Sequence, residues 1–390
     1  MMTPDYEQFR HAVLPEQNHD EFARQEFVKS LKLYLATHVS PKNRLVYEQM
    51  AKPQFERENG RAPETRHEVR KVMNKQGYYR FWSSMLRTSQ EMMWASCQLP
   101  IERQLDGLID QAKATGEAGG SLRLDPALEI PKYHTAVDIH CQPGAYHTEF
   151  ADEDVAAGAL YDSGVYVYAM GRMGPFNDDM GASQVGYIKA KFPDFAPKRI
   201  LDLGCAVGHS TLPYVDAYPD AEVHAVDVAA PMLRYAHSRA ESLGKTVHFS
   251  QQNAEKLDFE DGSFDLIVSH ILLHETSAKA LKNILSECSR LLAPGGLMVH
   301  SETPPYKDMD EYDAFILDWD TYNNNEPFWG YTHELDLDDL VSEAGFDPAH
   351  NFEALAPSVF EAAQNKRTNI FQGGDFGGGG IWYLWGCWKK

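Results

Sequence analysis

The sequence is poor in cysteine and has no long apolar run. Its five Cys residues in 390 are widely spaced and form no Cys-x-x-Cys pair, so we expect reduced thiols in a cytoplasmic protein. No run of 18 or more apolar residues occurs, which argues against a membrane-spanning helix. The first residues, MMTPDYEQFRHAV, carry charges where a signal peptide needs an apolar core. These absences predict a cytoplasmic protein with no membrane partner.

An excess of positive charge is also absent. The chain holds 36 Lys and Arg against 57 Asp and Glu, a formal net charge of −21. Proteins that bind a nucleic-acid backbone normally show the opposite bias, so we expect no nucleic-acid partner. The acidity lies in the second part of the chain: residues 1–150 carry 19 basic and 20 acidic residues, and the remainder carries 17 and 37.

Residues 1–120 are predicted to form a largely helical N-terminal domain. Large apolar residues recur at helical spacing in its first helix: Phe22, Phe27, Leu31 and Tyr34. The stretch FWSSMLRTSQEMMWASCQL (81–99) continues this period, a pattern more typical of core packing than of a cofactor site. The same Trp, Met and Phe content equally allows a homodimer through these helices. Residues 121–196 are expected to connect this domain to the next and to cover an active site, with one or two short strands in 132–146.

From residue 197 to 390 the sequence alternates between strand and helix patterns. Apolar strand segments are expected at 199–205, 222–228, 247–254, 264–271 and 296–302, and a further strand is expected at the end of the chain. This order predicts an α/β domain with a mostly parallel sheet and helices on both faces.

The residues that follow these strands predict the ligand, because an open parallel sheet binds ligands at the carboxyl ends of its strands. Gly204 and Gly208 after the first strand allow the backbone to approach a ligand closely. The spacing is not that of a dinucleotide fingerprint, and no Walker lysine follows. Asp202 suits an ammonium group, and Asp227 at the end of the second strand suits ribose hydroxyls. A ligand with both an amino-acid end and a ribose is S-adenosylmethionine.

Residues 197–303 resemble class I S-adenosylmethionine-dependent methyltransferases, of the small-molecule branch that includes ubiquinone- and menaquinone-type enzymes. The motifs that carry the resemblance are LDLGCAVG, AVDVAAPML, QQNAEKLDFEDGSFDLIVS and ECSRLLAPGGLM. The resemblance implies a Rossmann-like seven-stranded sheet with an antiparallel last strand. It also implies a methyltransferase that uses S-adenosyl-L-methionine.

The resemblance assigns the cofactor contacts residue by residue. Asp202–Gly208 would hold the methionyl part, Asp227 the ribose and Met232 the adenine, with Asn253 and Ala254 at its edge. The full expected set is Asp202, Gly204, Cys205, Ala206, Gly208, Asp227, Val228, Met232, Asn253, Ala254 and Ser269. Ala206 departs from the family, which commonly has glycine at this position.

Three residues after the fourth strand are the expected catalytic group. Methyl transfer needs alignment and exclusion of water, and a base is helpful rather than obligatory. His270 and His274 titrate near neutrality and follow the strand that ends beside the methyl group. Glu275 would orient either imidazole. We expect no metal, because the spacing of His134, His140, Cys141 and His147 fits no usual zinc pattern.

An insertion at 304–332 is expected to form a lid over the acceptor. It belongs to a segment, 302–343, with thirteen acidic residues and one Lys, and long insertions at the active edge of a sheet are usually functional. Its acidic residues form either a solvated face or ion pairs with the basic stretch 61–80. The expected substrate contacts from the lid and from the covering segment are Trp319, Tyr322, Asn324, Trp329, Tyr166 and Arg172.

The leading hypothesis is methyl transfer to a small-molecule acceptor at oxygen, nitrogen or sulfur. A methyltransferase that modifies protein or RNA is the first alternative. A regulatory protein that binds the cofactor without catalysis is the second.

Overall fold

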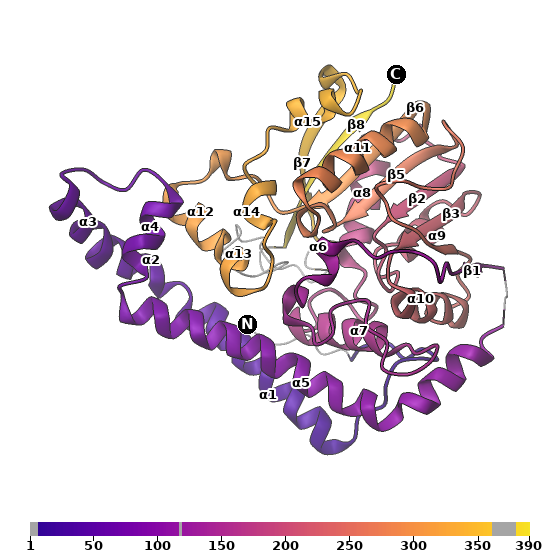
Figure 1. Cartoon of the computed structure of the whole chain (residues 1–390), viewed down its shortest axis with the longest axis horizontal. Helices are drawn as coiled ribbons and strands as arrows, with labels where there is room; N and C mark the ends of the chain where they lie inside the picture. The colour runs from indigo at the N-terminus through magenta and orange to yellow at the C-terminus, as the bar shows by residue number, and fades with distance from the viewer. Residues whose placement is uncertain (1–6, 117–118, 361–379) are drawn as a thin grey trace.

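A computed structural model describes residues 7–116, 119–360 and 380–390. Its N-terminal region is mostly helical, as predicted (Figure 1). The elements are α1 (His19–Tyr34), the π-helical turn η1 (Leu35–Val39), α2 (Lys42–Val46), a second π-helical turn η2 (Tyr47–Ala51), α3 (Lys52–Asn59), α4 (Arg66–Met73) and α5 (Gly77–Ala114). The 38-residue helix α5 runs along one side of the molecule and connects the arm formed by α2, α3 and α4 to the sheet domain.

Helix α1 begins with a capping box but turns its apolar residues outward. The side chain of Asn18 accepts a hydrogen bond from the backbone of Glu21, whose carboxylate accepts one from the Asn18 N–H. Apart from Val28, the buried residues of α1 are polar, and one of them, Lys32, donates to Gln90 at 3.1 Å. Phe27 is 58% exposed. The helix is therefore confirmed, but its apolar stripe does not face the core.

The sheet has eight strands, one more than expected, in the order β1-β4-β3-β2-β5-β6-β8-β7. Their bounds are β1 (Ser121–Arg123), β2 (Arg199–Leu203), β3 (Glu222–Asp227), β4 (His248–Gln251), β5 (Phe264–His270), β6 (Leu292–Glu302), β7 (Asn351–Pro357) and β8 (Ile381–Trp388). All neighbours are parallel except β8, which is antiparallel to both β6 and β7. The predicted mostly parallel Rossmann-like sheet is confirmed, and β1 adds an edge strand beside β4.

Helices cover both faces of the sheet. They are α8 (Asp179–Lys191), α9 (Leu212–Ala217), α10 (Ala230–Ser242) and α11 (Ala278–Leu291). Successive residues of β2 enter different cores, because side chains alternate along a strand. Ile200 packs with α8, α9 and α10, whereas Leu201 packs with α11 on the other face. The chain leaves β2 toward β3 and β4 and returns on the other side at β5, so the topological switch point lies between β2 and β5.

The segment between the N-terminal helices and β2 contains α6 (Lys132–Thr135), the 3₁₀ turn η3 (Ile139–Cys141) and α7 (Ala156–Tyr168). The prediction of short strands in 132–146 is wrong. His140 and Cys141 have φ values of 52° and 60°, which no extended strand allows. These left-handed residues instead bend the segment into turns.

The insertion after β6 is helical and packs on the N-terminal helices. Its elements, with those that follow, are the 3₁₀ turn η5 (Tyr306–Asp308), α12 (Glu311–Leu317), α13 (Trp319–Asn323), α14 (Trp329–Thr332), α15 (Leu337–Glu343) and the 3₁₀ turn η6 (Pro348–His350). Phe315 and Trp319 share one apolar core with Trp82 of α5. Arg66 and Arg70 both bind Asp318, at 3.0 and 2.6 Å. Part of the acidity is thus paired with the basic stretch 61–80.

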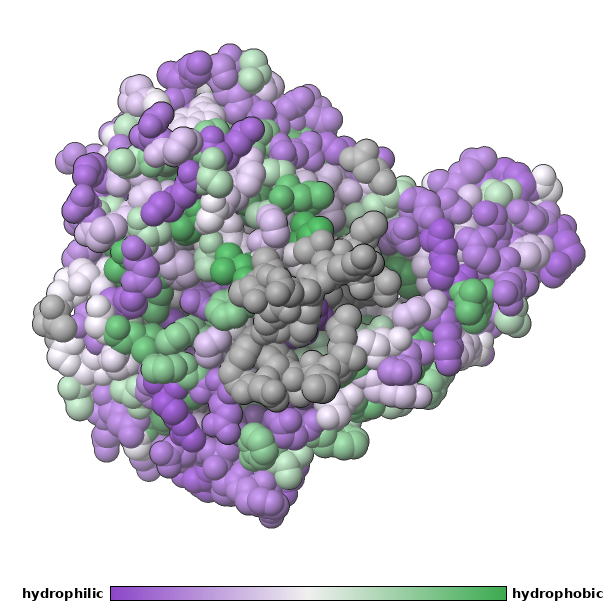
Figure 2. Space-filling view, turned by 180° about the vertical axis from the view of Figure 1, so that it is seen from behind, coloured by the Kyte–Doolittle hydropathy of each residue, from purple (hydrophilic) through white to green (hydrophobic). Residues whose placement is uncertain are grey.

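None of the helices in the described ranges combines the length and the apolar composition needed to cross a membrane. On the face shown in Figure 2, the projecting arm that contains α2, α3 and α4 is mainly hydrophilic.

The glycine-rich stretch 372–380, expected to be a hairpin connection or flap, lies outside the described residues except for Gly380. The division of the chain at 120 and 196 stays a prediction.

Candidate active site

The loop after β2 has the tight geometry that its glycines predict. Gly204 has φ +64°, and a Cβ there would lie 2.6 Å from Cδ1 of Leu272. A side chain at 204 would therefore displace the side chain of Leu272. Because Gly204 has no side chain, there is room for a ligand to approach the backbone at the carboxyl end of β2, where a ligand of this sheet is expected.

Ala206 occupies the same left-handed region without being glycine. Its φ is +46°, a conformation that costs a non-glycine residue roughly 1–2 kcal/mol. The Ala206 N–H donates to Oδ2 of Asp227 at 3.0 Å, and this contact helps to hold the strained residue in place. The departure from the family glycine is thus accommodated with strain rather than by a change of backbone.

Asp227, the last residue of β3, is held by backbone donors on both oxygens. Its Oδ1 accepts from Ala229 N–H at 2.9 Å, opposite the Ala206 contact on Oδ2. Burial raises the pKa of this carboxyl to about 6, and the backbone hydrogen bonds limit the rise. The side chain therefore titrates close to neutral pH.

A cleft opens beside Asp227, which we call the Asp227 cavity. Its walls include many of the residues expected to hold the cofactor: Gly204, Ala206, Asp227, Val228, Asn253 and Ala254. Tyr133, His134, Gln252 and Leu272 complete much of the remaining wall. Loss of hydration lowers the pKa of His134 to about 4, so this imidazole is neutral and adds no positive charge.

A second cavity, the Trp94 cavity, lies next to the first. Eight of its nineteen wall residues are aromatic or thioether side chains: Met93, Trp94, Tyr146, Tyr161, Tyr168, Met173, Met180 and Trp382. Polar groups enter at His140, His209, His270, Glu275 and Gln90. Helices α5 and α7 meet tightly here, because a Cβ on Gly164 would lie 2.2 Å from Cζ3 of Trp94.

The two cavities share a wall of five residues at the carboxyl end of the sheet: Tyr146, Tyr161, His270, Ile271 and Glu275. His270 ends β5, and its Nδ1 lies 3.3 Å from Oδ1 of the buried Asp202. Its Nε2 lies 3.3 Å from the Tyr214 hydroxyl. Side chains on the shared wall therefore border both cavities.

Glu275 begins a buried chain of alternating carboxylates and imidazoles. Its Oε1 lies 3.0 Å from His140 Nε2 and 3.3 Å from the Tyr146 hydroxyl. The chain continues from His140 through Glu326 to His274, whose Nδ1 lies 2.5 Å from Glu302. Loss of hydration acts to lower the pKa of His140, but Glu326 and Glu275 outweigh it and hold that pKa well above the usual value.

Several expected cofactor residues lie behind the cavity walls. Oδ2 of Asp202 accepts from the Thr211 hydroxyl at 2.5 Å and its Oδ1 faces His270, so Asp202 orients a wall residue. Met232 packs in a core cluster with α5 and α7. The others outside both walls are Cys205, Gly208 and Ser269. Of the expected catalytic group, His270 and Glu275 line both cavities, whereas His274 is fully buried behind them.

The expected substrate residues are scattered. Trp319 is a core residue that donates to Ser83 at 2.8 Å, and Tyr322 is 60% exposed beneath Arg70. Trp329 is buried, with its ring centroid 4.7 Å from that of His274. Asn324 supports the cluster from the insertion: its amide nitrogen lies 3.0 Å from Nδ1 of His140. Tyr166 and Arg172, like these four, are outside the two cavity walls.

Sequence reasoning missed His140, Tyr146 and Tyr161 as wall residues. They belong to the segment between the helical region and β2, far in sequence from the strands they face. For His140 and Tyr146 the local signal was the run DIHCQPGAYH (138–147), which concentrates polar and aromatic side chains. Their segment is bent by the left-handed residues at 140 and 141, which sequence patterns do not specify, and Tyr161 comes from helix α7.

The chain has clear similarity to known proteins over its α/β part. A family model described as a methyltransferase domain matches residues 200–296. The chain is 41% identical over 110 residues to the demethylmenaquinone methyltransferase of Thermus thermophilus, covering 28% of this chain and 49% of that protein. It is 34% identical over 207 residues to the demethylmenaquinone methyltransferase of Lactococcus lactis, covering 45% of this chain and 78% of that protein.

A third relative has a different name. The chain is 39% identical over 108 residues to the malonyl-[acyl-carrier protein] O-methyltransferase of Methylococcus capsulatus, covering 27% of this chain and 37% of that protein. The chain thus spans about half the length, or less, of the first relatives that it matches.

The sheet order, the loop after β2 and the position of Asp227 define a class I methyltransferase fold. The chain belongs to the class I S-adenosylmethionine-dependent methyltransferase family, as its sequence predicts.

Proposed function

We propose that the protein transfers the methyl group of S-adenosylmethionine to a small acceptor bound in the Trp94 cavity. The observation that carries the proposal is the shared wall: the cavity beside Asp227 has wall residues in common with a second cavity that has many aromatic side chains. A cofactor in the first cavity and an acceptor in the second would meet at this wall.

The Asp227 cavity suits the cofactor. Asp227 offers carboxylate oxygens for ribose hydroxyls. Because Gly204 has no side chain, the methionyl part has room to lie close to the backbone of the loop after β2. Asn253 and Ala254 lie on the same wall and would contact the adenine edge. Bound S-adenosylmethionine supplies an electrophilic methyl group, and transfer breaks the S–CH₃ bond, forms the acceptor–CH₃ bond and leaves S-adenosylhomocysteine and a proton.

The Trp94 cavity suits an acceptor that is largely apolar and planar. Trp94, Tyr168 and Trp382 offer aromatic faces, and the polar groups lie on one side, at His140 and Glu275. An acceptor would therefore direct a hydroxyl or amine toward the shared wall and keep its apolar part among the aromatic side chains. This arrangement aligns the nucleophile with the methyl group and excludes water, the two contributions that methyl transfer needs most.

We propose Glu275 and His270 as the groups that receive the proton of the acceptor. Both line the shared wall. His274 lies behind the wall, so its effect on the acceptor would pass through Glu326 and His140, which link it to the cavity. We also propose that the acceptor contacts come from the Trp94 cavity rather than from Trp319 or Tyr322.

Two measurements test the function. Calorimetry should detect binding of both S-adenosylmethionine and S-adenosylhomocysteine, and Asp227→Ala should abolish it. Methyl-labelled cofactor incubated with a metabolite extract should then label small molecules. Label found in protein or RNA alone would contradict the small-molecule acceptor, and absence of cofactor binding would contradict the whole proposal.

A homodimer through the N-terminal helices stays a proposal. It is supported by the exposure of Phe27 and Tyr34 on α1 and of Phe81 on α5, at 58%, 56% and 53%. Sedimentation of the full chain and of Phe27→Glu tests it: the variant should shift a dimer to a monomer. A monomeric wild-type chain at micromolar concentration would contradict it.

A further inference from the structure

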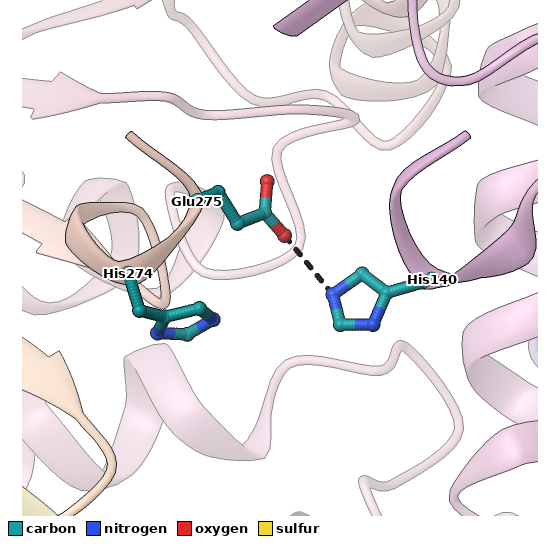
Figure 3. Close-up of side chains that lie close together, drawn as sticks. All are labelled: His140, His274 and Glu275. Atoms are coloured by element: carbon teal, nitrogen blue, oxygen red, sulfur yellow. Dashed lines mark hydrogen bonds and ion pairs between the residues drawn. The ribbon is translucent and has the colours of Figure 1, made fainter. Parts of the chain in front are cut away.

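Three side chains of the types that ligate metals lie close together (Figure 3). Two of them, His140 and Glu275, line the Trp94 cavity. His140 comes from η3, and His274 and Glu275 come from the 3₁₀ turn η4 (Leu273–Glu275). One ligand atom from each residue lies within 4.8 Å of the other two. His140 Nε2 lies 3.0 Å from Glu275 Oε1. Two histidines and one carboxylate are a donor set that first-row divalent cations prefer.

Each of the two imidazoles is held by a further carboxylate at its other ring nitrogen. Nδ1 of His140 lies 3.0 Å from Glu326, and Nδ1 of His274 lies 2.5 Å from Glu302. Histidines that ligate a metal almost always donate their second ring N–H to a carboxylate, carbonyl or water, which fixes the tautomer and the ring orientation. In both residues this carboxylate lies at Nδ1, and Nε2 faces the rest of the cluster: His140 Nε2 lies 3.0 Å from Glu275 Oε1, and His274 Nε2 lies 3.5 Å from Glu326 Oε2.

A buried carboxylate oxygen also points into the cluster. Glu326 is 1% exposed, and its Oε2 has no hydrogen-bond partner among the residues that the structure describes. This oxygen lies 3.5 Å from His274 Nε2. Glu326 Oε1 is fixed by the amide nitrogen of Asn324 at 3.0 Å. A buried ionised oxygen that makes no hydrogen bond is costly, and a cation beside it would reduce that cost.

We propose that His140, His274 and Glu275 bind one first-row divalent cation, of which Zn²⁺ is the representative. The two Nε2 atoms and the Glu275 carboxylate would be the ligands, and Glu326 and Glu302 would orient the histidines. Because His140 and Glu275 line the Trp94 cavity, the open positions of the ion face the acceptor. There the ion would bind an oxygen atom of the acceptor and favour its deprotonated form, and with Glu275 bound to the ion the proton would pass to His270. This role rests on the proposed methyl transfer, whereas the binding of the ion does not.

Metal binding by the full chain is the direct test. Protein stripped with a chelator and titrated with Zn²⁺ should bind about one ion per chain, as measured by elemental analysis after gel filtration. Co²⁺ in the same site should give visible d–d absorption bands. Glu275→Gln and His140→Ala should each weaken Zn²⁺ binding at least tenfold, and Glu326→Gln should weaken it about 10–100-fold, the effect typical of a residue that orients a ligand.

The matched control is His224→Ala. His224 Nε2 lies 3.3 Å from Glu222 Oε1, a histidine–carboxylate pair within β3 and outside the walls of both cavities. This variant should bind Zn²⁺ as the wild type does. A thermal melt and cofactor calorimetry on each variant separate loss of the site from loss of the fold.

The outcomes distinguish the two proposals. A folded protein that binds S-adenosylmethionine but takes up no Zn²⁺ or Co²⁺ overturns the metal site and leaves the methyltransferase proposal standing. Uptake that is unchanged in Glu275→Gln and His140→Ala also overturns it. Stoichiometric uptake lost in these variants supports the site even if no methyl acceptor is found.

Discussion

Nε2 of His209 lies 2.7 Å from Oδ1 of Asp162, and this contact joins the loop after β2 to helix α7. Asp162 is 1% exposed and also accepts hydrogen bonds from the Tyr235 hydroxyl at 2.8 Å and from Asn177 at 3.0 Å. His209 in turn lines the Trp94 cavity. One buried carboxylate thus ties the covering segment to the sheet domain at the wall of the site.

Asp162→Ala is expected to lower the free energy of unfolding by about 3–5 kcal/mol, the usual cost of removing one partner of a buried ionic network. Urea unfolding followed by circular dichroism at neutral pH measures it. Asp258→Ala is the control, because Asp258 pairs with Arg123 on the surface, where its side chain is 84% exposed. That change should stay within about 0.5 kcal/mol. Equal effects of the two substitutions would contradict a central role for Asp162.

The acid limb of the stability curve should also depend on Asp162. Burial alone would raise the pKa of this carboxyl, but His209 and His11 outweigh burial and hold the pKa well below 3.8. The unfolded chain therefore takes up the proton first, so the stabilisation is present above about pH 4 and is lost as the pH falls further. Asp162→Asn should flatten the loss of stability below pH 4, and an unchanged slope would contradict it.

Ala206→Gly is expected to stabilise the protein slightly. Glycine would remove the strain of a left-handed alanine, roughly 1–2 kcal/mol, and would lose about 0.4–1 kcal/mol through the more flexible unfolded chain. The net gain should be about 0.5–1 kcal/mol in chemical denaturation. Ala23→Gly within the exposed face of α1 is the matched control and should cost about 1 kcal/mol. The same sign in both variants would show that φ at 206 is not strained in solution.

The sequence was sufficient for the α/β part and for the residues that end its strands. Asp227 and Gly204 sit where strand order and glycine spacing predicted, because both depend on local pattern and on a topology rule. Phe27 and Trp319 show what could not be predicted from local sequence patterns. Helical spacing predicted the helix of Phe27 but not its outward face, since Lys29 and Lys32 instead pack over the Tyr166 and Tyr168 rings. Trp319 does not lie at the expected acceptor site, because the insertion packs on α5. This contact joins segments that are over 200 residues apart in the sequence.

Affinity for the cofactor is expected to fall in mild acid. Burial raises the pKa of Asp227 to about 6 in the free protein, and ribose hydroxyls form stronger hydrogen bonds to the ionised carboxylate than to the protonated carboxyl. Binding should therefore weaken as the pH drops through 6, by up to about tenfold per pH unit. Calorimetry with S-adenosylhomocysteine between about pH 5 and 7.5 measures this. Asp227→Asn should bind more weakly and with little pH dependence over this range. A wild-type affinity that stays constant would remove Asp227 from the ribose contact.

Gly164→Ala tests whether the Trp94 cavity holds the acceptor. A methyl group at 164 would lie 2.2 Å from Cζ3 of Trp94, so the indole must move and the cavity wall must change shape. We expect KM for the acceptor to rise by tenfold or more, roughly 1.4 kcal/mol, while the Kd of the cofactor stays unchanged, because neither residue lines the Asp227 cavity.

Gly186→Ala is the matched control for this change. Gly186 lies within α8, and a Cβ there would meet nothing within 4 Å. The control should keep both constants and raise stability by about 0.4–1 kcal/mol. Steady-state kinetics with any labelled acceptor, together with cofactor calorimetry, separates the outcomes. If Gly164→Ala leaves KM unchanged in a folded protein, the acceptor binds elsewhere. If it weakens the cofactor instead, the aromatic cavity belongs to the cofactor, and the assignment of the two cavities must be exchanged.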